Sequence, residues 1–175
     1  MRLNASIGGD SVSVDNQEKK GWQWTLDVNL MGVVYGAKTI VPLIKGHGEG
    51  GWIVNVASMA GMGGFLHGGA YNATKAAVVA LSESWAEELT SQNINVSVLC
   101  PAFVKTRIYD SERNRPKEYK SEISGSEGSN SFRKKTKKMI DNGIEVSIVG
   151  KRVVEALNNG ELYIFTHPNY RSEIQ

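Results

Sequence analysis

The run Trp52-Ile53-Val54-Asn55-Val56-Ala57 decides the fold of this 175-residue chain. It is short and mostly apolar, and a glycine-rich turn at residues 46–51 precedes it. Such a run is typical of a strand buried in a parallel sheet. The β-branched content of residues 94–99 predicts a second strand there, which ends before Pro101. A last strand is predicted at residues 162–165.

Helical patterns separate these strands. Apolar residues recur at helical spacing over residues 16–44, and Asp15 with Glu18 suggests a capping box at the start of that helix. A second helix is predicted at residues 71–92 and another at 147–157. The inner face of the second helix is expected to be small. Small residues let another helix approach closely, so this helix is expected to be packed on both sides or against a partner; the residues of this face are Ala73, Ala76, Ala77, Ala80 and Ser84. Alternating strands and helices imply right-handed crossovers, a parallel sheet and the α/β class.

Composition narrows the class of protein. Hydrophobic residues make up 41% of the chain, and the net charge is only +2, which gives no reason to expect nucleic acid or an acidic membrane as a partner. A single cysteine, Cys100, excludes an internal disulfide and fits a reducing compartment, so a cytoplasmic location is expected. No targeting segment is expected at residues 1–9. Polar residues and Pro42 interrupt the apolar stretch at 28–44, so we expect no membrane span.

Residues 105–138 differ from the rest of the chain. They contain 11 Lys/Arg against 5 Asp/Glu, a net charge of +6, so the remainder carries −4. Many serines and glycines accompany these charges, and the composition predicts a variable, mobile surface loop that buries little. A phosphate or nucleic-acid site is the less favoured alternative.

Tyr71 and Lys75 suggest acid–base chemistry. They lie four residues apart at a helix start, so their side chains share one face. A nearby ammonium group favours the phenolate and lowers a tyrosine pKa from its usual value of about 10. Ser58 follows the apolar strand, at the sheet edge where active groups of α/β folds gather, and its hydroxyl could donate to a substrate oxygen. Ordinary structural roles, a turn serine and a packed tyrosine, remain the alternative.

Four segments in order make the sequence similar to the short-chain dehydrogenase/reductases. They are Asn29, Val54-Asn55-Val56-Ala57-Ser58, Tyr71-Asn72-Ala73-Thr74-Lys75 and Cys100-Pro101-Ala102-Phe103-Val104-Lys105-Thr106. The resemblance implies a Rossmann-like, doubly wound parallel sheet. It also implies hydride transfer between NAD or NADP and a secondary alcohol or ketone. The segment after Thr106 would then be the substrate loop, for which a lid is the favoured function.

The resemblance also implies roles for individual residues. Tyr71 would be the acid/base, Lys75 would lower its pKa and bind the nicotinamide ribose, and Ser58 would orient the substrate oxygen. Asn29 would hold a water that relays protons towards Lys75. The implied cofactor-binding residues are Asn4, Ala5, Tyr71, Lys75, Pro101 and Thr106. A homo-oligomer through the long helix and the Tyr71–Lys75 helix is also implied.

The sequence departs from the family pattern at its start. Leu3-Asn4-Ala5-Ser6 resembles the family's Asn-Asn-Ala-Gly at the end of the fourth strand, so residues 1–175 are expected to form a single, partial domain. The first three strand–helix units, which hold the cofactor pyrophosphate, are absent from the sequence given. The alternative function is therefore a catalytically incompetent remnant. NAD cannot be distinguished from NADP, because the residue that selects between them belongs to those units.

Two further patterns are expected to carry no site. Gly46-His47-Gly48-Glu49-Gly50-Gly51 satisfies G-x-G-x-x-G, but it follows a helix and precedes a strand, the reverse of a dinucleotide site. His47, His67 and His167 show no metal-ligand spacing, so no metal is expected.

Overall fold

The computed structural model describes residues 2–3, 6–120, 122–123 and 127–167. The strands form one parallel sheet in the order β1-β2-β3-β4, with bounds Arg2–Leu3, Gly51–Val56, Ile94–Cys100 and Tyr163–Phe165. β2 and β3 pair along their whole common length, from Gly51 with Ile94 to Val56 with Leu99. The predicted α/β class, the strand positions and the parallel sheet are confirmed.

One long helical segment runs from Lys19 to His47. It consists of α1 (Lys19–Leu26), a π-helical turn η2 (Asp27–Met31) and α2 (Gly32–His47). The predicted capping box is wrong. Asp15 lies in a separate 3-10 helix, η1 (Val14–Asn16), and Glu18 is the N-cap of α1 without a side-chain cap hydrogen bond.

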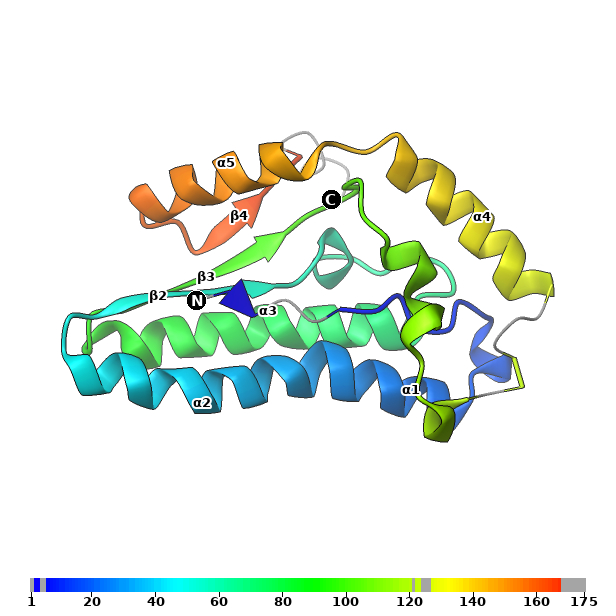
Figure 1. The fold of residues 1–175 in the computed structure, drawn as a ribbon, viewed down its shortest axis with the longest axis horizontal. Coiled ribbons are helices and arrows are strands. Elements are labelled where there is room, and N and C mark those ends of the chain that lie inside the picture. Colours follow the sequence, from blue (N-terminus) through cyan, green and yellow to red (C-terminus); the bar gives the residue numbers. More distant parts are fainter. Residues whose placement is uncertain (1, 4–5, 121, 124–126, 168–175) are drawn as a thin grey trace.

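Helices cover both faces of the sheet (Figure 1). α2 and α3 (Gly69–Thr90) pack on one face and α5 (Val146–Asn158) on the other. Side chains alternate along the strands between these two layers, because successive residues of a strand point to opposite faces. Ile53 and Val98 belong to the core on the α2–α3 side, while Val54 and Leu99 pack with α5.

The expected inner face of α3 is wrong. Its small residues Ala73, Ala76 and Ala80 are exposed, and the helix buries a different set: Ala70, Thr74, Lys75, Val78, Val79, Ser82 and Leu89. The sheet selects the valine face because larger side chains fill the space between helix and strands. The small residues are therefore left on the outer surface of the described chain.

The segment 105–138 is more regular than its composition predicted. It contains two 3-10 helices, η4 (Ile108–Asn114) and η5 (Lys117–Tyr119), and most of helix α4 (Glu127–Asp141). Among its described residues Ser111 and Arg115 are buried, whereas most of the others are exposed or partly exposed. Its mobility stays a prediction.

One helical segment in the described part of the chain, Lys19–His47, is long and apolar enough to cross a membrane by length and composition alone. Core helices of soluble proteins pass the same test. Val33, Ala37 and Ile44 from this segment join the core beneath the sheet. The expectation of no membrane partner stays a prediction, as do the cytoplasmic location and the absence of a nucleic-acid partner.

Candidate active site

The candidate catalytic residues gather at the carboxyl edge of the sheet, where α/β folds bind ligands. Ser58 follows β2 and caps the 3-10 helix η3 (Met59–Gly61), accepting a hydrogen bond from the backbone N–H of Ala60 at 3.2 Å. Its hydroxyl donates to the carbonyl of Pro101, just beyond β3, at 3.4 Å. The ends of two neighbouring strands thus fix the position of the Ser58 hydroxyl.

Tyr71 lies beside Ser58, in the first turn of α3. Burial raises the pKa of Tyr71, and a hydrogen bond between its side chain and that of Ser58 lowers it in part. The net direction is upward, opposite to the effect expected from Lys75. The tyrosine is therefore a neutral proton donor at physiological pH.

Lys75 lies one helical turn further along and is almost completely buried, with 1% of its surface exposed. Its Nζ donates to the carbonyl of Val56 at 3.0 Å and lies 5.6 Å from the centre of the Tyr71 ring. Burial lowers the pKa of Lys75 from 10.5 to about 8, since desolvation disfavours the ammonium form. The lysine therefore remains mainly charged at pH 7 and loses its charge a little above that pH.

Cys100, the last residue of β3, lies next to this pair. Burial raises the pKa of its thiol to about 12, although the backbone of Ser58 and the charge of Lys75 both act in the opposite direction. The thiol stays protonated at neutral pH. Lys75 is thus the cation of this buried cluster, with no thiolate to neutralise it.

The side chain of Asn29 makes its hydrogen bonds within the fold. It lies in the π-helical turn and is fully buried. Its Oδ1 accepts from the N–H of Ile7 at 2.8 Å, and its Nδ2 donates to the carbonyl of Ile7 at 3.0 Å. A longer contact of 3.4 Å joins Nδ2 to Thr74, the neighbour of Lys75. The side-chain amide therefore ties the chain after β1 to the helices, and a water relay through Asn29 stays a prediction.

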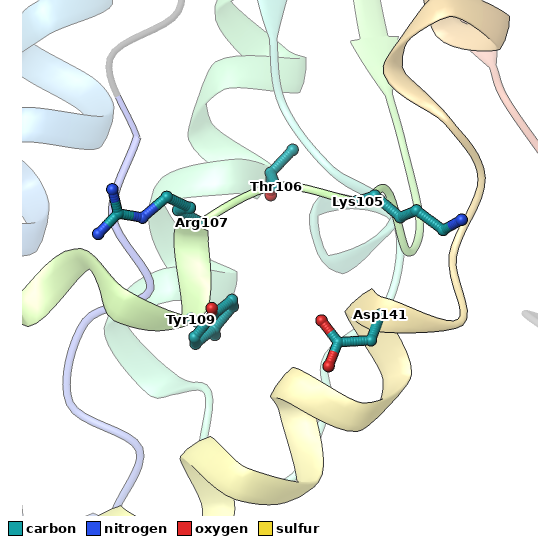
Figure 2. A pocket seen from close by; sticks show the side chains of 5 residues that line it. All are labelled: Lys105, Thr106, Arg107, Tyr109 and Asp141. Atoms are coloured by element: carbon teal, nitrogen blue, oxygen red, sulfur yellow. The ribbon is translucent and has the colours of Figure 1, made fainter.

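Two of the implied cofactor-binding residues lie outside α3 and after β3. Pro101 lies beside Ser58, and Thr106 lies at the margin of the catalytic cluster. Thr106 is exposed and lines an open cavity of about 460 Å³ between η4 and α4, with Lys105, Arg107, Tyr109 and Asp141. Tyr109 and Asp141 point into this space, whereas Lys105 and Arg107 point away from it (Figure 2). Asn4 and Ala5 lie outside the described residues.

The basic segment after Thr106 is attached to the body by acidic residues. Arg115 has 1% of its side chain exposed; it pairs with Asp10, pairs with Glu112 at 3.0 Å, and lies 4.4 Å from the centre of the Trp24 ring. The Tyr119 hydroxyl donates to Asp27 at 2.9 Å. The basic segment and the acidic body therefore attract each other. Ion pairs and charged hydrogen bonds hold the segment after Thr106 against the region around α1.

Sequence reasoning missed three features of this region. Asn55 lies fully buried in β2, where Nδ2 donates to Ser82 at 2.9 Å and Oδ1 has no hydrogen-bond partner among the described residues. The pairing of Asp10 with Arg115 joins residues 105 positions apart. Phe65 lies against Tyr71, with ring centres 5.9 Å apart. An amide within an apolar strand was a visible signal for Asn55, whereas the other two depend on tertiary contacts.

The G-x-G-x-x-G pattern at residues 46–51 lies between α2 and β2. It therefore has the helix-to-strand context that excludes a dinucleotide-binding turn. Among the described residues, no group of three or more His, Cys, Asp or Glu side chains is placed to hold a metal ion.

Comparison with known proteins identifies the family. The family model for short chain dehydrogenases matches residues 1–117. A "CLA biosynthesis dehydrogenase/reductase" of Lactiplantibacillus plantarum is 34% identical over 89% of this chain and 56% of its own length. A short chain dehydrogenase/reductase from Burkholderia phymatum, solved in complex with NAD, superposes with a TM-score of 0.93 and 32% identity, over 99% of this chain and 62% of its own.

The chain belongs to the short-chain dehydrogenase family. A C alpha-dehydrogenase of Sphingobium sp. is also similar, at 31% identity over 88% of this chain and 50% of its own length. The chain thus spans about half the length of the curated relatives it matches. The sheet is the corresponding part of a Rossmann fold.

Proposed function

We propose that the chain is the catalytic part of an oxidoreductase that interconverts a secondary alcohol and a ketone with NAD or NADP. The observation that supports this most is the cluster of the Ser58 and Tyr71 hydroxyls, hydrogen-bonded to each other beside the buried ammonium of Lys75. Two neutral hydroxyl donors next to a cation are suited to a carbonyl oxygen that gains negative charge during reduction.

The chain's own residues divide the proton chemistry between them. In the reduction direction Ser58 orients the substrate oxygen, and Tyr71 donates its proton to that oxygen. The positive charge of Lys75 stabilises the phenolate that remains. The raised pKa of Tyr71 favours donation, and this charge is what allows the proton to leave near neutral pH. Above about pH 8 the lysine becomes neutral, so this stabilisation is lost.

The described residues fit the nicotinamide end of a dinucleotide. A bound cofactor would supply or accept the hydride. Lys75 provides a cation and Thr106 an exposed hydroxyl at the same edge of the sheet. Ser6, just after β1, has a buried hydroxyl without a hydrogen-bond partner in the described part of the chain, as expected of a group that binds a ligand. Asn4, Ala5 and Pro101 are proposed to contribute beside it.

The alternative function is a remnant that has the catalytic cluster but binds no dinucleotide. The chain covers 56% of the length of the Lactiplantibacillus plantarum relative, and the resemblance implies that the units that hold the pyrophosphate are not contained in the sequence given. Titration of the chain with NADH and with NADPH, followed by nicotinamide fluorescence, separates the two. Saturable binding supports the oxidoreductase, whereas a linear response with both nucleotides supports the remnant.

We also propose that copies of the chain associate through α2 and α3. Tyr35 and Leu43 of α2 are 61% and 62% exposed, and the row of small residues on α3 faces outward beside it. Sedimentation equilibrium tests this. A substitution of Ala76 by Arg is expected to shift the chain to the monomer, and an unchanged mass would contradict the assignment.

A further inference from the structure

An apolar rim borders the catalytic cluster. The loop between η3 and α3 leaves Met62, Phe65 and Leu66 exposed by 37%, 41% and 77%. The backbone N–H of Gly68 donates to the carbonyl of Phe65 at 3.2 Å and closes a turn in which His67 has φ 62°. A positive φ in the turn's third residue is the geometry of a type II turn, which begins at Phe65 and places Leu66 at its corner.

Phe65 is fixed beside the reacting tyrosine. Its ring centre lies 5.9 Å from that of Tyr71 at an interplanar angle of 54°. Its carbonyl accepts from Nδ2 of Asn72 at 3.0 Å, so the helix that carries Tyr71 also holds the loop. At Gly68 a Cβ would lie 2.6 Å from the Phe65 ring, and only glycine leaves room for this placement.

Phe132 of α4 continues the row of rings. Its centre lies 6.3 Å from that of Phe65, and the two planes are within 11° of parallel. Arg133, the next residue, fixes this part of α4 by donating from Nε to the carbonyl of Tyr109 at 3.2 Å and by pairing with Asp110 at 3.3 Å. Two segments distant in sequence thus place Phe65 and Phe132 together, and we name this pair the aromatic wall.

We propose that the aromatic wall binds the apolar part of the substrate, so that the favoured substrate has an aromatic or alicyclic ring next to its reacting carbon. This inference rests on the proposed function, since it places the substrate oxygen at Ser58 and Tyr71. The rings of Phe65 and Phe132 continue from Tyr71 in a row, with successive ring centres 5.9 and 6.3 Å apart. A flat apolar group gains contact area and ring stacking along this row, whereas a short aliphatic chain reaches little of it.

The test compares acetophenone with 2-butanone, ketones that differ in the group beside the carbonyl. Ligand-observed NMR measures their binding to the chain, and kcat/KM measures their reduction with NADH or NADPH. Acetophenone is expected to bind about tenfold more tightly than 2-butanone. Phe132→Ala is expected to reduce that preference about three- to tenfold, and Phe132→Leu to give an intermediate loss because it keeps apolar volume without a ring.

Val154→Ala in α5 is the control, because it truncates an exposed apolar residue on another helix. It should keep the preference for acetophenone. Equal binding of both ketones to the parent chain, or an unchanged preference in Phe132→Ala, would overturn the proposal. Phe65→Ala provides a second variant should Phe132→Ala not fold.

Tyr71→Phe separates this inference from the proposed function. It keeps the aromatic row but removes the proton donor, so it should retain the binding preference while turnover is lost. If turnover survives in Tyr71→Phe while Phe132→Ala loses the preference, the aromatic wall stands and the assigned acid/base fails.

Discussion

The buried charge of Lys75 should make the stability of the fold depend on pH. Its pKa falls from 10.5 in the unfolded chain to about 8 in the folded one. At about 1.4 kcal/mol for each pH unit, keeping this lysine charged and buried at pH 7 costs about 3 kcal/mol. Between pH 8 and 10.5 the unfolded chain holds a proton that the folded chain has lost, so the free energy of unfolding rises with pH.

Cys100 acts in the opposite direction. Its pKa rises from 9.0 to about 12 on folding, so between these values the folded chain holds the extra proton and stability falls as pH rises. The two effects overlap above pH 9. The contribution of Lys75 is therefore clearest between pH 8 and 9, and clearer still in a Cys100→Ala background, where it should add about 1 kcal/mol.

Urea unfolding followed by tryptophan fluorescence at pH 7.0, 8.0 and 9.0 measures this. The Cys100→Ala chain should gain about 1 kcal/mol from pH 8 to 9, and the double variant with Lys75→Met should not. Lys151→Met, at an exposed position in α5, is the matched control and should keep the gain. A flat profile in Cys100→Ala, or an equal rise in the double variant with Lys75→Met, would refute the assignment of a buried, charged lysine.

Two further substitutions test how the site is supported. Asp10→Ala removes one of the two carboxylate partners of the buried Arg115 and leaves Glu112, so we expect a loss of about 1.5–3 kcal/mol in the free energy of unfolding. A loss below 1 kcal/mol would contradict the buried ion pair. Gly61→Ala places a Cβ 2.6 Å from the carbonyl oxygen of Lys75 and should cost about 1–3 kcal/mol. Gly46→Ala, where a Cβ would meet nothing within 4 Å, is its control; equal stability of the two variants would argue against the close approach.

The local pattern of apolar residues in the sequence was sufficient to predict the main strands and helices of the fold. The runs at 52–57 and 94–99 are apolar and β-branched, and they become β2 and β3 within one residue at each end. Helical periodicity located the helix over Gly69–Thr90 but not its buried face. A run of alanines and a run of valines have the same period, and only the neighbouring strands determine which of them is covered.

The segment after Thr106 shows the limit of composition. Its charges predicted a loop because an isolated charged segment buries little apolar surface. Arg115 becomes buried because Asp10 and the Trp24 ring supply an anion and an apolar surface from a distant part of the chain. No pattern within residues 105–138 contains that information.

The candidate site was predictable as a set of residues but not as an electrostatic arrangement. Motif spacing placed Ser58, Tyr71 and Lys75 together at the sheet edge. It did not indicate that burial would raise the pKa of Tyr71 and lower that of Lys75, because both shifts depend on how deeply the helix packs. Asn29, identified from its position in the resemblance, has its side chain engaged with Ile7.

Turnover of Tyr71→Phe tests the central assignment most directly. The comparison is reduction of acetophenone with NADH or NADPH by the parent chain, by Tyr71→Phe, and by Tyr35→Phe, which makes the same change at an exposed tyrosine of α2. Loss of a positioned proton donor should lower kcat by about 10²- to 10⁴-fold in Tyr71→Phe and leave Tyr35→Phe unchanged. A Tyr71→Phe chain that retains the parent kcat would contradict the account.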